Sequence, residues 1–151
     1  MSLPGGAMIE PARIAEVMGG TAVLRRRVKS LEDLEEAVGN GLPKEVLRIV
    51  ARRIYTVAFD VNQLVYRIVP KATYMRRRSK LRMHESERTE RLSRVIAAAE
   101  EVWESRRDAR AWLVKPHPEL AGRTPIACAL TELGARQVEE LLARLEYGLP
   151  V

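Results

Sequence analysis

The longest periodic stretch of the sequence is ESERTERLSRVIAAAEEVWE, residues 85–104. Apolar residues recur in it at the i, i+3, i+4, i+7 spacing that places side chains on one face of an α-helix, with acids and bases opposite. This spacing predicts a long helix that buries one face in a core. The residues of that face are Leu92, Val95, Ile96, Ala99, Val102 and Trp103.

Start signals for further helices lie on the N-terminal side of this stretch. Residues 11–18 form a short amphipathic pattern. Ser30 with Asp33 three residues later resembles a capping box, which predicts a helix that begins there and ends at Gly39. Residues 21–29 (TAVLRRRVK) are ambiguous between a strand and a linker. No other segment has a strand pattern, so the sequence predicts an all-α fold.

Residues 43–80 predict two helices followed by a short basic one. Pro43 suits the first turn of a helix, and the apolar residues after it have helical spacing. Asp60 with Gln63 marks a second start. Pro70 ends that segment or opens the next one, PKATYMRRRSK. The core positions that we expect in these helices are Val46, Leu47, Val50, Ile54, Leu64, Ile68 and Met75.

The charge of the chain is concentrated in its middle. Residues 44–94 carry fourteen Lys or Arg and five Asp or Glu, a net charge of +9, whereas residues 1–43 carry −1 and residues 95–151 carry −2. A basic block between nearly neutral flanks is typical of a module that binds a polyanion. The alternative is an arginine-rich helix surface that is merely solvated, and charge alone favours nucleic acid only slightly.

Two helices joined by a tight turn, the second rich in Arg, Lys, Thr and Tyr, form the pattern of a helix-turn-helix that reads DNA. Here DVNQLVYRIV would be the supporting helix, and PKATYMRRRSK the recognition helix in the major groove. Arginine grips guanine edges, and hydroxyl groups reach phosphates. The residues that we expect to contact DNA are Lys71, Thr73, Tyr74, Arg76, Arg77, Arg78 and Lys80.

The sequence lacks a recognisable catalytic or metal-binding constellation. His84, His117 and Cys128 are the only histidines and cysteine, and none has the close ligand spacing of a zinc site. Cys128 lies in an apolar segment where a small buried thiol is the ordinary expectation. We therefore expect no enzymatic activity, no cofactor and no metal.

The C-terminal third contains the loop KPHPELAGRTP, residues 115–125, between two helices. Its prolines end one helix, Gly122 permits a backbone conformation that other residues avoid, and Thr124 caps the next helix. Nothing about the turn requires Arg123, which is either a surface cation or the partner of an acidic group inside or outside the chain. The last helix is expected to pack Val138, Leu141, Leu142 and Leu145 and to stop at Gly148.

The sequence shows no apolar run of the roughly 20 residues that a membrane span needs. Its start lacks the pattern of a secretory signal, and a single cysteine excludes an intramolecular disulfide. These observations favour the cytoplasm.

Several segments resemble the antitoxins of RES–Xre type toxin–antitoxin systems, which combine an Xre-like DNA-binding part with an Xre/MbcA/ParS toxin-binding domain. The matching segments are GLPKEVL (41–47), VPKATYMRRR (69–78), HESERTERLSRV (84–95) and AWLVKPHPELAGRTPIACALTELGARQVEELLARLEYG (111–148). The last is the most specific. The resemblance implies a variable leader over residues 1–29, a helix-turn-helix domain over 30–95 and a helical toxin-binding domain over 96–151.

The resemblance also implies a function. The chain would neutralise a RES-domain toxin that degrades NAD by covering its active site, and would bind operator DNA as a homodimer to repress its own operon. The alternative is a stand-alone DNA-binding regulator without a toxin. The residues expected to contact the toxin are Arg123, Glu146, Tyr147, Gly148, Leu149, Pro150 and Val151, although a chain end of this kind is also typical of a frayed terminus.

Overall fold

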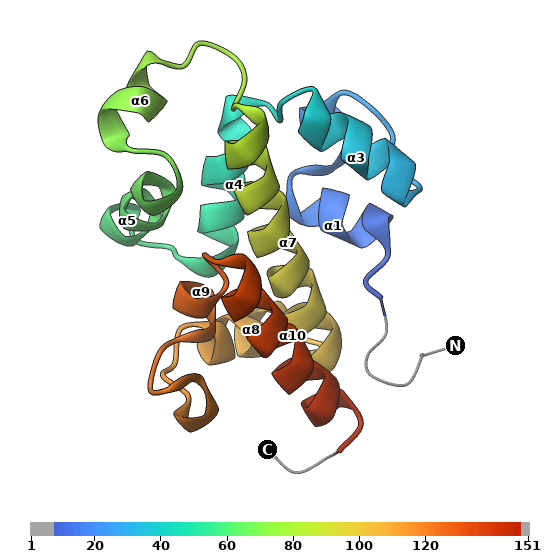
Figure 1. Ribbon diagram of the computed structural model, residues 1–151, viewed down its shortest axis with the longest axis vertical. Helices are drawn as coiled ribbons and strands as arrows, with labels where there is room; N and C mark the ends of the chain where they lie inside the picture. Colours follow the sequence, from blue (N-terminus) through green and yellow to red (C-terminus); the bar gives the residue numbers. More distant parts are fainter. Residues whose placement is uncertain (1–7, 149–151) are drawn as a thin grey trace. The chain divides into compact units, whose positions relative to one another are not determined.

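A computed structural model describes residues 8–148 of the chain (Figure 1). Within that range it contains ten α-helices, one 3-10 turn and no strand. The only pairing of β type among these residues is a single bridge between Pro43 and Lys80. The prediction of an all-α fold is confirmed.

Contacts divide the chain into two compact units. Glu10–Ser93 form the first, called here the N-terminal unit. Arg94–Val151 together with Met1–Ile9 form the second, called here the C-terminal unit. The division falls within the long helix α7, and residues 10–29, part of the leader that the resemblance implies, lie in the N-terminal unit.

The N-terminal unit is built around α4 and α5, which pack closely on each other (Figure 1). Helix α1 contacts α2, α3 and α4, and α6 packs on α5. All the core positions predicted for α4 are buried, and so are Leu64 and Ile68 of α5. The helices are α1 (Pro11–Val17), α2 (Gly20–Leu24), α3 (Leu31–Gly39), α4 (Lys44–Ile54), α5 (Ala58–Ile68), α6 (Lys71–Arg76) and α7 (Met83–Trp103), of which only the first half of α7 belongs to this unit.

Local signals placed some helix starts correctly and one segment wrongly. The capping box before α3 is present: the Asp33 amide donates to the Ser30 hydroxyl at 3.1 Å, and the Ser30 amide donates to the Asp33 carboxylate at 3.2 Å. Residues 21–29 were ambiguous between a strand and a linker; residues 21–24 belong to the short helix α2, and residues 25–29 are neither helix nor strand. The residue before α2, Gly19, has a φ of 109°, which favours glycine and lets the chain reverse directly after α1.

A backbone pairing joins the start of α4 to the segment after α6. The Lys44 amide donates to the Ser79 carbonyl at 2.9 Å, and the Leu81 amide donates to the Leu42 carbonyl at 2.9 Å. Gly41 makes this approach possible, because a Cβ there would lie 2.5 Å from the Leu81 carbonyl oxygen. The basic segment after α6 is therefore fixed by the main chain.

Helix α7 buries hydroxyl groups as well as apolar side chains. The Leu42 amide donates to the Ser86 hydroxyl at 2.9 Å, and the buried Thr89 and Ser93 hydroxyls donate to carbonyls one turn back. Most of the predicted apolar face is buried, but Trp103 at its end is 37% exposed, so its prediction as a core residue was wrong.

The C-terminal unit consists of the second half of α7 and four shorter elements. These are α8 (Arg106–Leu113), the 3-10 turn η1 (Pro118–Leu120), α9 (Pro125–Cys128) and α10 (Glu132–Glu146). Helix α9 contacts both α8 and α10 (Figure 1). Val138, Leu141 and Leu142 of α10 are buried as predicted, and the Cys128 thiol is buried too.

Hydroxyl caps begin three of these helices. Ser105 accepts from the Asp108 amide, Thr124 from the Ala127 amide and Thr131 from the Gly134 amide. The cap at Thr124 was predicted from the sequence, and the cap at Thr131 was not. Over residues 8–148, no helix is both long and apolar enough to cross a membrane.

Candidate functional sites

The loop at residues 115–125 is closed by its own hydrogen bonds. The His117 amide donates to the Arg123 carbonyl, and the Gly122 amide donates to the His117 carbonyl, each at 3.1 Å. The His117 Nδ1 accepts from the Glu119 amide at 3.1 Å, which shows that the ring is part of the turn. Gly122 has the expected positive φ, 77°, and Ala121 adopts a positive φ of 57° beside it.

Two polar links tie this loop to α10. Arg144 of α10 pairs with Glu119 at 2.8 Å, and the Arg123 Nη2 donates to the Gln137 side chain of α10 at 3.3 Å. The Arg123 Nε also donates to the Leu120 carbonyl at 3.1 Å. Arg123 is exposed, and the partners seen are a carbonyl and an amide side chain of its own unit rather than an acidic group. The loop therefore positions the last helix.

Helix α10 ends at an exposed group of residues. Glu146 and Gly148 are exposed, and Tyr147, at the C-cap, is 42% exposed. Gly148 has a φ of 67°, the left-handed conformation that terminates helices. The structure thus presents three of the residues predicted to contact a toxin on one helix end, while Leu149, Pro150 and Val151 lie outside the described residues.

Both tryptophans of the chain lie in one aromatic cluster of this unit, which the sequence analysis did not predict. The Trp103 and Trp112 rings lie 6.4 Å apart, and the Trp112 and His117 rings lie 6.2 Å apart in an edge-on arrangement. The sequence could not predict this cluster beyond the aromatic residue types themselves, because the three residues come from different elements.

In the N-terminal unit, α5 and α6 form two helices joined by the two residues Val69 and Pro70 (Figure 1). Lys71, Ala72, Met75 and Arg76 form an exposed face of α6. This spacing is that of one side of a helix, and two of its four residues are cationic. Met75 is 62% exposed, so its prediction as a core residue was wrong.

Tyr74 occupies the core position instead of Met75. It is 4% exposed, its ring meets Tyr66 edge-on, and the Lys44 Nζ lies 4.5 Å from the ring centroid. Its hydroxyl donates to the Lys44 carbonyl. The structure therefore gives this hydroxyl, which was predicted to contact DNA, a partner inside the N-terminal unit.

Arg77 also points into the protein. Its guanidinium binds both carboxylate oxygens of Glu85, and these side chains are 16% and 5% exposed. Burial alone would raise the pKa of Glu85, but the Arg82 amide that donates to it and the Arg77 guanidinium outweigh this effect, and the pKa is lowered. Arg77 was predicted to contact DNA; the structure gives it an internal partner that anchors the start of α7.

The remaining predicted DNA contacts lie at the surface. Lys71, Arg76, Arg78 and Lys80 are exposed, and Thr73 is half-buried. The unit therefore presents a cationic surface that runs from α6 into the segment after it, as the charge distribution predicted.

Comparison with known proteins agrees with this arrangement. Residues 98–148 match the family model of the antitoxin Xre/MbcA/ParS C-terminal toxin-binding domain, a segment that includes the 115–125 loop and all of α10. The chain is also 28% identical over 150 residues to an Antitoxin Xre from Pseudomonas putida, covering 92% of this chain and 94% of the relative. The chain is therefore similar to an Xre antitoxin over most of its length, and residues 98–148 match the toxin-binding domain of such antitoxins.

The match assigns residues 98–148, which make up most of the C-terminal unit, to a toxin-binding type of domain and implies a cognate toxin as partner. The family is one of antitoxins rather than enzymes, which confirms the prediction of a non-enzymatic protein. Within residues 8–148, no three His, Cys, Asp or Glu side chains are grouped closely enough to hold a metal ion.

Proposed function

We propose that this chain neutralises a RES-type toxin that degrades NAD, and that it does so by covering the toxin's active site with the end of α10. The match of residues 98–148 to the toxin-binding domain carries this proposal. The RES identity of the toxin rests on the resemblance of residues 111–148, in which the proline-rich loop and the closing Glu-Tyr-Gly occur together.

The geometry of α10 supports its end as the covering element. Tyr147 offers an apolar ring with a polar tip, the kind of side chain that anchors many interfaces. The Arg144–Glu119 and Arg123–Gln137 links hold the last three turns of α10 against the loop. A helix end fixed in this way can enter a cleft with little loss of conformational entropy.

Truncation tests this role. A chain that stops at Leu145 retains Arg144 and the buried residues of α10, so it should stay folded and lose protection against the co-expressed toxin. Tyr147→Ala should weaken toxin binding at least tenfold, as expected for an interface anchor. Leu133→Ala, at the opposite end of the same helix and 71% exposed, is the matched control. Full protection by the truncated chain would exclude this role of the helix end.

We also propose that the N-terminal unit binds operator DNA and represses the operon. The exposed face of α6 supports this, since it places Lys71 and Arg76 on one side of a helix that follows a two-residue turn. Arg76→Ala should weaken binding to the DNA upstream of the gene and lower the salt slope by roughly one unit if Arg76 holds a phosphate. An unchanged slope and affinity would mean that the face is only solvated.

Operator binding as a homodimer would place two copies of α6 about 34 Å apart, one turn of DNA. Sedimentation of the free chain and of its DNA complex measures the number of copies, and footprinting measures the spacing of half-sites. A monomer in both states would exclude this arrangement. A chain that binds DNA but no RES-domain protein would instead be a stand-alone regulator.

A further inference from the structure

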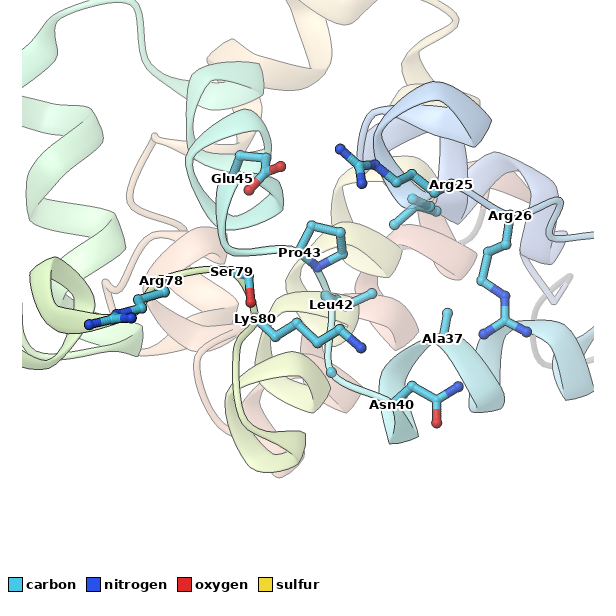
Figure 2. Close-up of a pocket in the computed structure, with 12 residues that line it drawn as sticks. Arg25, Arg26, Ala37, Asn40, Leu42, Pro43, Glu45, Arg78, Ser79 and Lys80 are labelled. Carbon is cyan, nitrogen blue, oxygen red and sulfur yellow. The ribbon is translucent and has the colours of Figure 1, made fainter.

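The N-terminal unit contains an open cavity of about 530 Å³. It lies between the end of α2, the end of α3, the start of α4 and the segment that follows α6 (Figure 2). Its lining residues are Leu24, Arg25, Arg26, Ala37, Asn40, Gly41, Leu42, Pro43, Glu45, Arg78, Ser79 and Lys80.

Cations dominate the charge of this cavity. Arg25, Arg26, Arg78 and Lys80 line it, against the single carboxylate of Glu45. In Figure 2 the Lys80 side chain extends across the middle of the cavity and Arg26 follows the opposite wall, whereas Arg78 points away from both. The arrangement suits a ligand with negatively charged oxygens.

The main chain holds these cations in place. Lys80 is fixed by the bridge to Pro43, and the amides on either side of that bridge are hydrogen-bonded. Arg25 is the C-cap of α2 with a φ of 57°, an uncommon conformation for a residue other than glycine. Arg26 pairs with Glu36 through its Nη2 at 2.6 Å, while its buried Nε has no hydrogen-bond partner among the described residues.

We propose that this cavity binds a backbone phosphate of DNA beside the groove that α6 enters. The proposal rests on the DNA binding proposed above and adds a second contact to it. Exposed cations run from Lys71 and Arg76 on α6 through Arg78 to Lys80 at the cavity, which suits a polymer with a phosphate at every step better than a single small anion.

The lining of the cavity also favours a phosphodiester over a free nucleotide. It contains no aromatic side chain on which a base could stack, and its polar side chains are four cations, one amide, one hydroxyl and the single carboxylate of Glu45. A contact of this kind carries no sequence information. It should therefore contribute equally to operator and to random duplex.

The test measures binding of the full chain to a labelled duplex from upstream of its gene and to a random duplex of equal length, at about 50 to 200 mM salt. The variants are Lys80→Gln and Arg25→Asn, because asparagine tolerates the backbone conformation at position 25. Arg27→Gln is the matched control, since Arg27 is exposed and adjacent but does not line the cavity. Circular dichroism confirms that each variant is folded.

We expect each cavity variant to weaken binding to the two duplexes by the same factor. When the salt is raised across that range, each variant should lose about 3.5-fold less affinity than the wild type loses, which corresponds to one phosphate contact. Arg27→Gln should leave both quantities unchanged. If the cavity variants bind DNA like the wild type while Arg76→Ala binds weakly, the phosphate contact at the cavity is excluded and the proposed DNA binding stands. If Arg76→Ala also has no effect, both the cavity contact and the proposed DNA binding are excluded.

Calorimetry with ADP in the absence of DNA distinguishes the other source of phosphate. Micromolar binding that Lys80→Gln abolishes, with DNA binding unchanged, would assign the cavity to a free nucleotide and overturn the proposal. Absence of such binding, together with the altered salt slope, supports the DNA contact.

Discussion

Replacing Arg77 should lower the stability of the fold, whereas replacing its neighbour Arg76 should weaken the DNA binding proposed above. Arg77 is 16% exposed and its partner Glu85 is 5% exposed, so Arg77→Ala would leave a buried carboxylate without its cation. Breaking a buried pair in this way costs about 3–5 kcal/mol, and the remaining exposure of Arg77 places this case near the lower end. For a chain of this size, about 3 kcal/mol corresponds to a fall in Tm of about 6–12 °C.

The assay pairs thermal unfolding followed by circular dichroism with DNA binding at a temperature where each variant is folded. Arg76→Ala is the matched control: Arg76 is exposed at the last position of α6, and its loss should change Tm by less than about 2 °C, as is usual for surface substitutions. A second variant, Arg77→Met, keeps the apolar stem and should be as destabilising as alanine if the charge pair matters. An unchanged Tm in both Arg77 variants, with DNA affinity weakened as in Arg76→Ala, would refute this reasoning.

Three further predictions concern stability. In Gly134→Ala the new Cβ would lie 2.0 Å from the Cys128 carbonyl oxygen, so α9 and α10 must shift, and the free energy of unfolding in urea should fall by about 1–3 kcal/mol. In the control Gly39→Ala the new Cβ meets open space, so this change should be neutral or stabilising by up to about 1 kcal/mol. Equal effects of the two substitutions would contradict this prediction. Because the pKa of Glu85 is lowered in the folded state, its contribution is complete above the ordinary value of 4.5 and is lost as the pH falls below it, so Glu85→Gln should show a flatter decline of Tm under acid than the wild type. Ser30→Ala removes the cap of α3 and should cost about 1 kcal/mol in the same urea assay, and a change near zero would show that this helix end does not depend on its cap.

Helix starts set by short-range chemistry were predictable from sequence. Ser30 and Thr124 each accept a hydrogen bond from the amide three positions further along the chain, and such a bond depends only on neighbours in the chain. The cap at Thr131 was missed because Gly134, at the third helical position, gives no capping-box signal. Its glycine is required by contact with another element, which local patterns do not encode.

The short basic helix shows where periodicity fails. With six residues, α6 spans too few turns for the apolar period to fix which side faces inward, and Tyr74 rather than Met75 is buried. The hydrogen bond from Arg123 to Gln137 was not predicted for a related reason, since Gln137 lies on another element. In both cases the deciding partner is distant in sequence.

The three consecutive arginines at the end of α6, residues 76–78, have three different environments. Arg76 is the last helical residue and lies on the exposed face. Arg77 is the C-cap with extended backbone, which redirects its side chain to Glu85, and the Lys44 Nζ donates to its carbonyl. Arg78 follows in the segment that the β-bridge holds beside the cavity. The end of the helix, rather than the charge of the run, therefore decides which cation is available to DNA, and extending α6 by one turn should disrupt folding and DNA binding together.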